Sequence, residues 1–146
     1  MRAVVQRVRF ARVTVGPDVV GEIGPGVCVL LGVAEEDSDD DARRLARRVA
    51  SLRIFENEEG RLDRSVLDAG GAALVVSQFT LIADTRKGNR PSFGGAAPAD
   101  RARTLYMVFC DQLRLEGVAD VQTGAFGARM LVEIGNDGPV TILLDT

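Results

Sequence analysis

The sequence predicts a single α+β domain over residues 1–146, with a largely antiparallel, barrel-like β-sheet core and two main helices. Several stretches carry the alternating or continuous apolar residues that are typical of β-strands. Two longer stretches carry apolar residues at helical spacing, and strands separate them along the chain. The 146 residues contain no repeat and no low-complexity linker, so one domain accounts for the length.

The first part of the chain predicts three strands. Residues 3–15 alternate in the manner of a strand, and a Pro-Asp turn leads into a short returning strand over residues 16–24. Residues 26–34 form a continuous apolar run of the length expected for a buried strand.

The first helix is expected within residues 38–55. Apolar residues recur there at helical spacing: Ala42, Leu45, Ala46, Val49 and Leu52. Ser38 and Asp41 resemble a capping box, and acidic residues crowd the first turn, where the helix dipole favours them. The opposite face carries Arg43, Arg44, Arg47 and Arg48. These arginines form either a solvated face or a patch for an RNA backbone.

The rest of the chain predicts a second helix between strands. In order, we expect a polar turn over 56–65, a buried strand over 70–81, a long irregular loop over 82–100, an amphipathic helix over 98–113, and strands over 118–124, 128–134 and 140–146. Pro98 is compatible with the first turn of the second helix.

The composition excludes several kinds of catalysis. The chain contains no histidine, which removes Ser-His-Asp and Cys-His catalysis, histidine general bases and most zinc sites. Cys28 and Cys110 lie inside apolar runs and are interpreted as reduced core residues. An enzyme with this composition would use hydroxyls, carboxylates, backbone dipoles or groups of its substrate.

The charge and hydropathy predict a cytoplasmic protein. No apolar run approaches the ~18–20 residues of a membrane span, and the N-terminal residues lack the features of a signal peptide. The formal net charge is −3, so any contact with a nucleic acid has to come from a local basic patch.

The first candidate site lies at the end of the strand predicted over residues 70–81. Ser77, Gln78 and Thr80 interrupt an apolar run just before a long loop, which is a common position for a binding site. Alternatively, these residues only satisfy backbone groups at a strand end. A Ser or Thr without a base is a poor nucleophile, so chemistry here would require backbone N–H groups and an already activated bond.

The second candidate site lies in the long loop. Arg86, Lys87 and Arg90 surround a glycine, and Phe93 follows closely. Cations beside an aromatic ring are typical of single-stranded nucleic-acid recognition. A solvated basic loop is the alternative.

The third candidate is the segment 135–141, between two predicted strands. Asn-Asp-Gly favours a turn, and a trans Pro139 is the default because few X-Pro bonds in folded proteins are cis. Proline at the third position of a four-residue turn is nevertheless typical of the cis-containing type VI turn.

These stretches together resemble the D-aminoacyl-tRNA deacylase family, also called D-tyrosyl-tRNA deacylases. The motifs that carry the resemblance, in order, are MRAVVQRV, GEIGPGVCVLLGV, LVVSQFTLIADT, GNRPSF and NDGPVT. The similarity runs from Met1 to Thr146, and the combination of Ser-Gln-Phe-Thr with a terminal Asn-x-Gly-Pro-Val-Thr is specific.

The resemblance implies a function and an assembly. Members of the family are cytoplasmic homodimers that cleave the ester between the 3′-terminal adenosine of a tRNA and a D-amino acid. They also act on glycine mischarged onto tRNA for alanine, and they need no metal or organic cofactor. The ester is already reactive, so placement and oxyanion stabilisation can replace a strong base.

The resemblance also implies roles for individual residues. The pocket for the adenosine and the ester would be lined by Ser77, Gln78, Phe79 and Thr80. Thr80 is either the nucleophile, or the ribose 2′-OH supplies the key hydroxyl while backbone N–H groups near Phe79 and Thr80 polarise the ester. We favour the second view, because Thr80 has no histidine to activate it and no lysine in its motif.

The remaining roles concern chirality and tRNA binding. The family pattern makes Gly138-Pro139 a cis pair that acts in the active site of the other subunit, where it holds the α-ammonium and excludes an L side chain. Arg7 is a clamp on this Gly-Pro segment or an ordinary surface cation. The other expected contacts are an apolar wall from Phe93 and Met130, and acceptor-stem phosphates bound by Arg86, Lys87 and Arg90. Residues 94–99 are less polar than the family pattern.

Two rival functions follow from the same residues. One is an RNA-binding module that keeps the 3′-adenosine pocket without turnover. The other is a metal-dependent esterase, which the absence of histidine disfavours.

Overall fold

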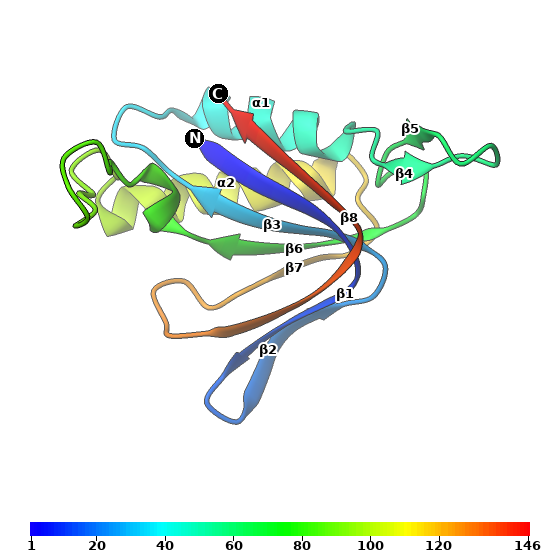
Figure 1. The fold of residues 1–146 in the computed structure, drawn as a ribbon, viewed down its shortest axis with the longest axis horizontal. Coiled ribbons are helices and arrows are strands. Elements are labelled where there is room, and N and C mark those ends of the chain that lie inside the picture. The colour runs from blue at the N-terminus through cyan, green and yellow to red at the C-terminus, as the bar shows by residue number, and fades with distance from the viewer.

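The centre of the protein is a six-stranded mixed sheet in the order β2-β1-β3-β6-β7, with β8 on the other edge of β1 (Figure 1). The structure is a computed structural model that describes residues 1–146. The elements are, in order, β1 (Arg2–Val15), β2 (Asp18–Ile23), β3 (Gly26–Gly32), α1 (Asp39–Ala50), β4 (Phe55–Glu56), β5 (Leu62–Arg64), β6 (Ala72–Ser77), the 3-10 helix η1 (Phe79–Ile82), α2 (Ala99–Leu115), β7 (Val121–Thr123) and β8 (Leu131–Asp145).

The long strand β1 organises the sheet. Its first half pairs with β3, its second half pairs with β2, and β8 pairs along its other edge, all antiparallel. The pairs β3–β6 and β6–β7 are parallel. The sheet curls until β2 lies against β7, where Gly21 leaves no room for a Cβ beside the carbonyl of Thr123. The α+β class and the barrel-like core are therefore confirmed.

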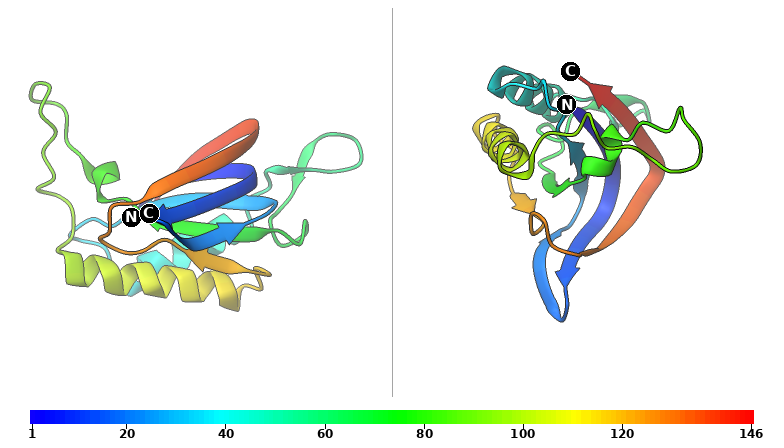
Figure 2. Two further views of the ribbon diagram at one scale, coloured as in Figure 1. Left: turned by 90° about the horizontal axis from the view of Figure 1, so that it is seen from below. Right: turned by 90° about the vertical axis from the view of Figure 1, so that its left-hand side faces the viewer.

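Both helices cover the same face of the sheet and pack against each other (Figure 2, right). Leu45 and Val49 of α1 and Leu105, Phe109 and Leu113 of α2 are buried there with apolar residues of the central strands. A second, smaller cluster lies inside the curl of β1, β2, β3 and β6. This packing turns the end of β6 toward the first turns of α2, and the main cavity forms at that junction.

Helix α1 begins as the sequence predicts. The Ser38 hydroxyl accepts from the Asp41 N–H at 3.3 Å, and the Asp41 carboxylate accepts from the Ser38 N–H at 2.9 Å. The helix ends at Ala50, so Leu52 lies beyond it, although its partly buried side chain still packs against the core. Pro98 is the N-cap of α2 and does not lie in its first turn.

Two other predicted segments differ from the structure. The strand expected over residues 70–81 ends at Ser77, and the chain continues as η1 because Gln78 turns away after donating its N–H to Leu31 at 2.8 Å. Residues 56–65, expected as a polar turn, contain most of a small antiparallel pair, β4–β5.

Most of the two C-terminal strands predicted over 128–134 and 140–146 belongs to one continuous strand, β8, so the turn with a trans Pro139 expected between them is wrong. The register with β1 shifts between the pairs Gln6↔Thr141 and Val8↔Asn136. Between these pairs, residues 137–140 of β8 stand opposite Arg7 alone, so Gly138 and Pro139 lie in a bulge of the strand. The Gly138–Pro139 peptide bond is cis.

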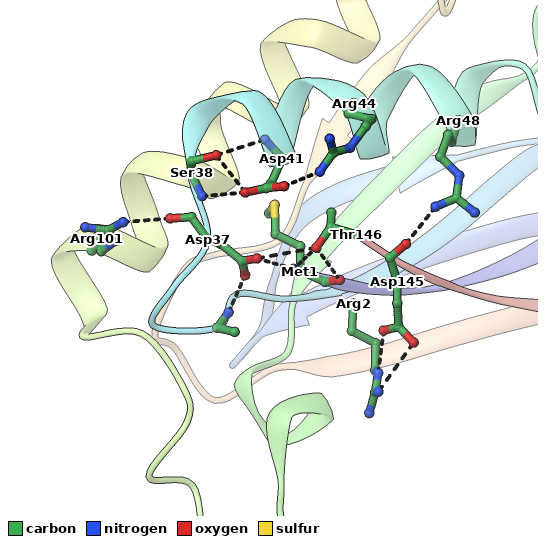
Figure 3. A network of polar contacts seen from close by, with 11 residues as sticks. Met1, Arg2, Asp37, Ser38, Asp41, Arg44, Arg48, Arg101, Asp145 and Thr146 are labelled. Carbon is green, nitrogen blue, oxygen red and sulfur yellow. Dashed lines mark hydrogen bonds and ion pairs between the residues drawn. The ribbon is translucent and has the colours of Figure 1, made fainter.

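The two chain ends are joined by a polar network beside α1 (Figure 3). The Met1 ammonium pairs with the buried Asp37 carboxylate and donates to the Thr146 hydroxyl at 2.6 Å. The Thr146 N–H donates a hydrogen bond to the Met1 carbonyl at 3.1 Å. Asp37 also accepts from the Ala34 N–H, and Arg101 of α2 donates to the Asp37 carbonyl.

Neither helix combines the length and apolarity that crossing a membrane requires.

Candidate active site

The main cavity, of about 520 Å³, lies between the end of β6, the start of α2 and the segment that leads into β8. Its lining consists of Val76, Ser77, Gln78, Phe79, Ala96, Ala97, Ala99, Ala102, Phe126, Gly127, Ala128, Met130 and Val132. Most of these residues are apolar, and the Ser77 hydroxyl and Gln78 amide are the polar side chains among them. The cavity therefore has an apolar body with its side-chain polarity concentrated at one wall, as in many small-molecule sites.

The polar wall is built where β6 ends beside β3. Gly32 of β3 packs so closely that an added Cβ would lie 3.0 Å from the Leu81 Cβ and 3.1 Å from the Gln78 carbonyl oxygen. This close approach holds η1 against the sheet. The Phe79 side chain, 55% exposed, stands at the rim, and Phe93 packs edge-on against it with 5.0 Å between ring centroids.

Thr80 lies beside this wall and is not part of the cavity lining. Its hydroxyl oxygen accepts a hydrogen bond from the Gln78 amide. A neutral amide cannot accept a proton from a hydroxyl, so this contact does not activate Thr80. Phe79 and Thr80 are the first residues of η1, and the leading N–H groups of a helix have no partner within it.

The opposite wall contains residues that the sequence did not single out. Ala96, Ala97 and Ala102 line the cavity together with Phe126 and the predicted Met130. Within the weakly polar segment 94–99, Ala96, Ala97 and Ala99 line the cavity, which accounts for the apolar character of these three positions. Phe126 is half-buried in the glycine-containing sequence TGAFG, directly before the exposed residues 127–129, and an aromatic residue in such a loop was a signal for it.

Phe126 is supported by the helix beneath it. The rings of Tyr106 and Phe126 are tilted, with 5.8 Å between centroids, and the Tyr106 hydroxyl donates to the Val75 carbonyl at 2.7 Å. Burial raises the pKa of Tyr106 well above its usual range. Tyr106 is therefore a neutral donor that fixes the ring, and it does not serve as a base.

The basic residues of the long loop lie on an arm that projects from the molecule (Figure 2, left). Asp84 and Ser92 close the arm with two backbone hydrogen bonds of 2.8 and 2.9 Å. Arg86 donates two side-chain bonds to Asp84, at 2.9 and 2.7 Å, and these lower the pKa of Asp84 to about 2. Lys87 and Arg90 are exposed and take part in no ion pair.

Gly138 and Pro139 are exposed on β8 and do not line the main cavity of their own chain. Gly138 lines a separate, shallow depression with Arg7 and Glu56, and this depression shares no residue with the main cavity. The structure thus keeps the two predicted parts of the site apart within one chain.

Arg7 is a buried clamp, and its interpretation as an ordinary surface cation is wrong. Its side chain is 7% exposed and donates to the carbonyls of Asp137 and Ile54, at 3.0 and 2.9 Å. The Glu56 carboxylate lies 3.5 Å away. These contacts fix the backbone next to Gly138 and leave the guanidinium little surface for a substrate.

The arginines of α1 and the two cysteines are also accounted for. Arg43 and Arg44 pair with acidic residues of the first turn, Arg47 pairs with Glu116, and Arg48 donates to the Asp145 carbonyl. These four arginines therefore make contacts within the chain. Cys28 and Cys110 are free and buried, and burial raises the pKa of both thiols to about 12.

Known proteins match the chain over its full length. The model of the family described as D-Tyr-tRNA(Tyr) deacylase matches residues 4–145. The D-aminoacyl-tRNA deacylase of Roseiflexus sp. (strain RS-1) is 62% identical over 146 residues, which cover 100% of this chain and 94% of that protein. That of Thermus aquaticus is 56% identical, covering 100% and 95%.

Two solved structures share the fold. The structure titled "c-Myc DNA Unwinding Element Binding Protein" superposes with a TM-score of 0.94 at 45% identity and covers 100% of this chain and 99% of its own. A probable eukaryotic D-amino acid tRNA deacylase gives a TM-score of 0.85 at 20% identity, with 99% and 98% covered, which supports the fold alone.

These relatives define the class of the protein as a hydrolase that acts on aminoacyl-tRNA. Within that class, the chain belongs to the D-Tyr-tRNA(Tyr) deacylase family, and its activity is that of a D-aminoacyl-tRNA deacylase.

Proposed function

We propose that the main cavity holds the 3′-terminal adenosine of D-aminoacyl-tRNA, with the ester at the wall formed by Ser77, Gln78 and Phe79. The observation that carries this assignment is the polar strand end opening into an otherwise apolar cavity of about 520 Å³. Aromatic and apolar walls accept a base and ribose, and the polar groups at one end orient the ester.

Hydrolysis then proceeds without a protein nucleophile. Water attacks the ester carbonyl carbon, the bond to the ribose 3′ oxygen breaks, and that oxygen takes up a proton as the amino acid leaves. The 2′-OH of the same ribose orients the water, and the N–H groups of Phe79 and Thr80 stabilise the oxyanion. The engagement of the Thr80 hydroxyl with the Gln78 amide supports this assignment.

Selection for the D-amino acid falls to Gly138-Pro139 of a partner subunit in a homodimer. The pair is exposed, it is clamped by Arg7 through Asp137, and it lies outside the cavity of its own chain, so a second copy can present it to that cavity. Its carbonyls hold the α-ammonium, and its backbone occupies the space of an L side chain. Rejection by collision can exceed the ~1–3 kcal/mol that one methylene of attraction supplies.

The proposal has further parts, which concern a second substrate, tRNA binding and the conditions of the reaction. A glycyl ester has no side chain to exclude, so glycine mischarged onto tRNA for alanine is also a substrate. Lys87 and Arg90, with Arg86 beside them, contact acceptor-stem phosphates from the projecting arm. The reaction takes place in the cytoplasm and requires no metal or organic cofactor.

The test compares D-tyrosyl-tRNA with L-tyrosyl-tRNA in the presence of EDTA and follows release of the amino acid. Rapid loss of the D ester alone is expected. Equal loss of both esters would contradict selection for the D-amino acid by Gly138-Pro139. Loss of activity in EDTA would favour the rival function, a metal-dependent esterase.

The alternative is a nucleic-acid-binding module without turnover. The name of one structural relative refers to binding a DNA element, and the free cations of the arm are compatible with nucleic-acid binding. Binding of tRNA with neither ester cleaved would favour this alternative.

A further inference from the structure

A second hollow, of about 370 Å³, lies beside the main cavity along α2. It is lined by Arg103, Tyr106, Met107, Cys110, Asp111, Arg114, Thr123 and Phe126. Phe126 lines both hollows, so they adjoin at this side chain. Nothing in the proposed reaction uses this second hollow.

Arg103 is the free cation of the hollow. Its guanidinium carbon lies 5.4 Å from the centroid of the Phe126 ring, and it takes part in no ion pair. The other arginines of α2 are engaged: Arg101 donates to the Asp37 carbonyl, and Arg114 bonds to Asp111 and the Val121 carbonyl. Asp111 is therefore neutralised by Arg114, and Arg103 gives the hollow a positive charge.

The hollow also offers apolar contact area. Met107 lies one helical turn after Arg103 and is 56% exposed, so it presents apolar surface beside the Arg103 cation. An exposed apolar surface beside an unpaired cation and an aromatic edge matches the chemistry of single-stranded RNA: a base packs on the apolar part, and the cation meets a phosphate.

We propose that this second hollow binds the nucleotide that precedes the terminal adenosine, with its phosphate at Arg103 and its base over Met107. The inference rests on the proposed placement of the terminal adenosine in the main cavity. Because the two hollows share Phe126, successive nucleotides of one strand can occupy both. The occupant is the single-stranded 3′ end of the same substrate.

The experiment compares two substrates of different length: D-tyrosyl-tRNA, and a D-tyrosyl ester of adenosine that lacks every upstream nucleotide. With Arg103→Ala, we expect kcat/KM for the tRNA ester to fall about tenfold or more, mainly through KM, because the phosphate contact is lost. The adenosine ester should be cleaved as by the unaltered protein. Arg103 is exposed and unpaired, so the variant should keep its thermal stability.

Arg61→Ala is the matched control. Arg61 is an exposed arginine whose ion pair is to Glu59 near the β4–β5 pair, and it lines neither hollow. It should leave both substrates unaffected. Equal losses on the two substrates with Arg103→Ala would mean that Arg103 acts on the main cavity through Phe126, and this would overturn the inference. Unchanged cleavage of the tRNA ester would overturn it as well.

Phe79→Ala separates this inference from the proposal beneath it. Loss of cleavage of both substrates is expected, since Phe79 lines the main cavity. If Phe79→Ala cleaves both substrates normally, the main cavity does not hold the adenosine, whatever Arg103→Ala does.

Discussion

At the scale of single residues, Thr80 is the position that distinguishes a protein nucleophile from catalysis by the 2′-OH of the substrate. Its hydroxyl accepts from a neutral amide, and no group able to remove its proton bonds to it. We expect Thr80→Ala to retain most of its activity on D-tyrosyl-tRNA, with kcat within about twofold of that of the unaltered protein, because the backbone N–H groups and the substrate 2′-OH remain. Single-turnover hydrolysis measures this directly.

The matched substrate for this variant is a tRNA that ends in 2′-deoxyadenosine. The unaltered protein should cleave that ester far more slowly than the ribose form. A loss of about 10³-fold or more in Thr80→Ala, with the deoxy substrate cleaved normally, would make Thr80 the nucleophile.

Arg7 decides the position of the Gly138-Pro139 segment. Arg7→Gln leaves the carbonyls of Ile54 and Asp137 without their donor, so the free energy of unfolding should fall by about 1–3 kcal/mol. Activity on D-tyrosyl-tRNA should fall too, since the segment loses its clamp. Urea unfolding and initial rates measure the two effects.

Arg9→Gln is the control for Arg7→Gln. Arg9 lies two residues away and contacts the carboxylate of the same Asp137, but its side chain is 81% exposed. Its removal should change the free energy of unfolding by less than about 1 kcal/mol. Equal effects of the two variants would contradict the role of Arg7 as a buried clamp.

At the scale of elements, local chemistry predicted some boundaries and tertiary pairing set others. The capping residues Ser38 and Asp41 marked the start of α1, since capping depends on neighbours in sequence. The continuity of β8 through Gly138-Pro139 was not predictable locally, because pairing with β1 along its length overrides the turn residues. Which strands are parallel also depends on distant partners.

The candidate site divides in the same way. Ser77 and Gln78 were visible in the sequence because polar residues interrupted an apolar run. Ala97 and Ala102 were not, since apolar residues on a cavity wall have the same pattern as core residues, whereas the position of Phe126 in a glycine-containing loop was a weak signal that was not used. Arg103 could not be singled out from the sequence, because only the folded structure shows which arginines have a carboxylate partner and which lie over an aromatic ring.

The arm over residues 84–92 gives a pH prediction. Hydrogen bonds from Arg86 lower the pKa of Asp84 from 3.8 to about 2 in the folded protein. The stabilisation of the arm by this carboxylate is therefore fully present above about pH 4 and is lost as the pH falls through about 2. Carboxyl NMR shifts should give Asp84 a midpoint near 2, whereas Arg86→Gln should return it toward 3.8. A midpoint near 3.8 in the unaltered protein would show that the Arg86 pair does not hold the arm.

At the scale of the whole molecule, the network of Met1, Asp37 and Thr146 ties the chain ends to α1 and α2 (Figure 3). Asp37→Asn removes the charge that faces the buried Met1 ammonium. Because an unpaired buried charge is costly, the free energy of unfolding should fall by about 3 kcal/mol, as measured by urea denaturation.

Asp63→Asn provides the comparison. Asp63 forms an exposed ion pair with Arg53 at 3.1 Å, so its loss should change the free energy of unfolding by less than about 1 kcal/mol. If Asp37→Asn is no more destabilising than Asp63→Asn, the ammonium pair contributes little to holding the ends together.

Burial of the Met1 ammonium has a practical consequence. The chain contains a single lysine, Lys87, and it is exposed on the arm proposed to face tRNA. With the α-amino group enclosed, an amine-directed dye has one accessible target on the native protein. One adduct per chain, located at Lys87 by peptide mass spectrometry, is the expected product. Such a protein would carry a fluorescent reporter beside the proposed RNA-binding face without any engineered cysteine.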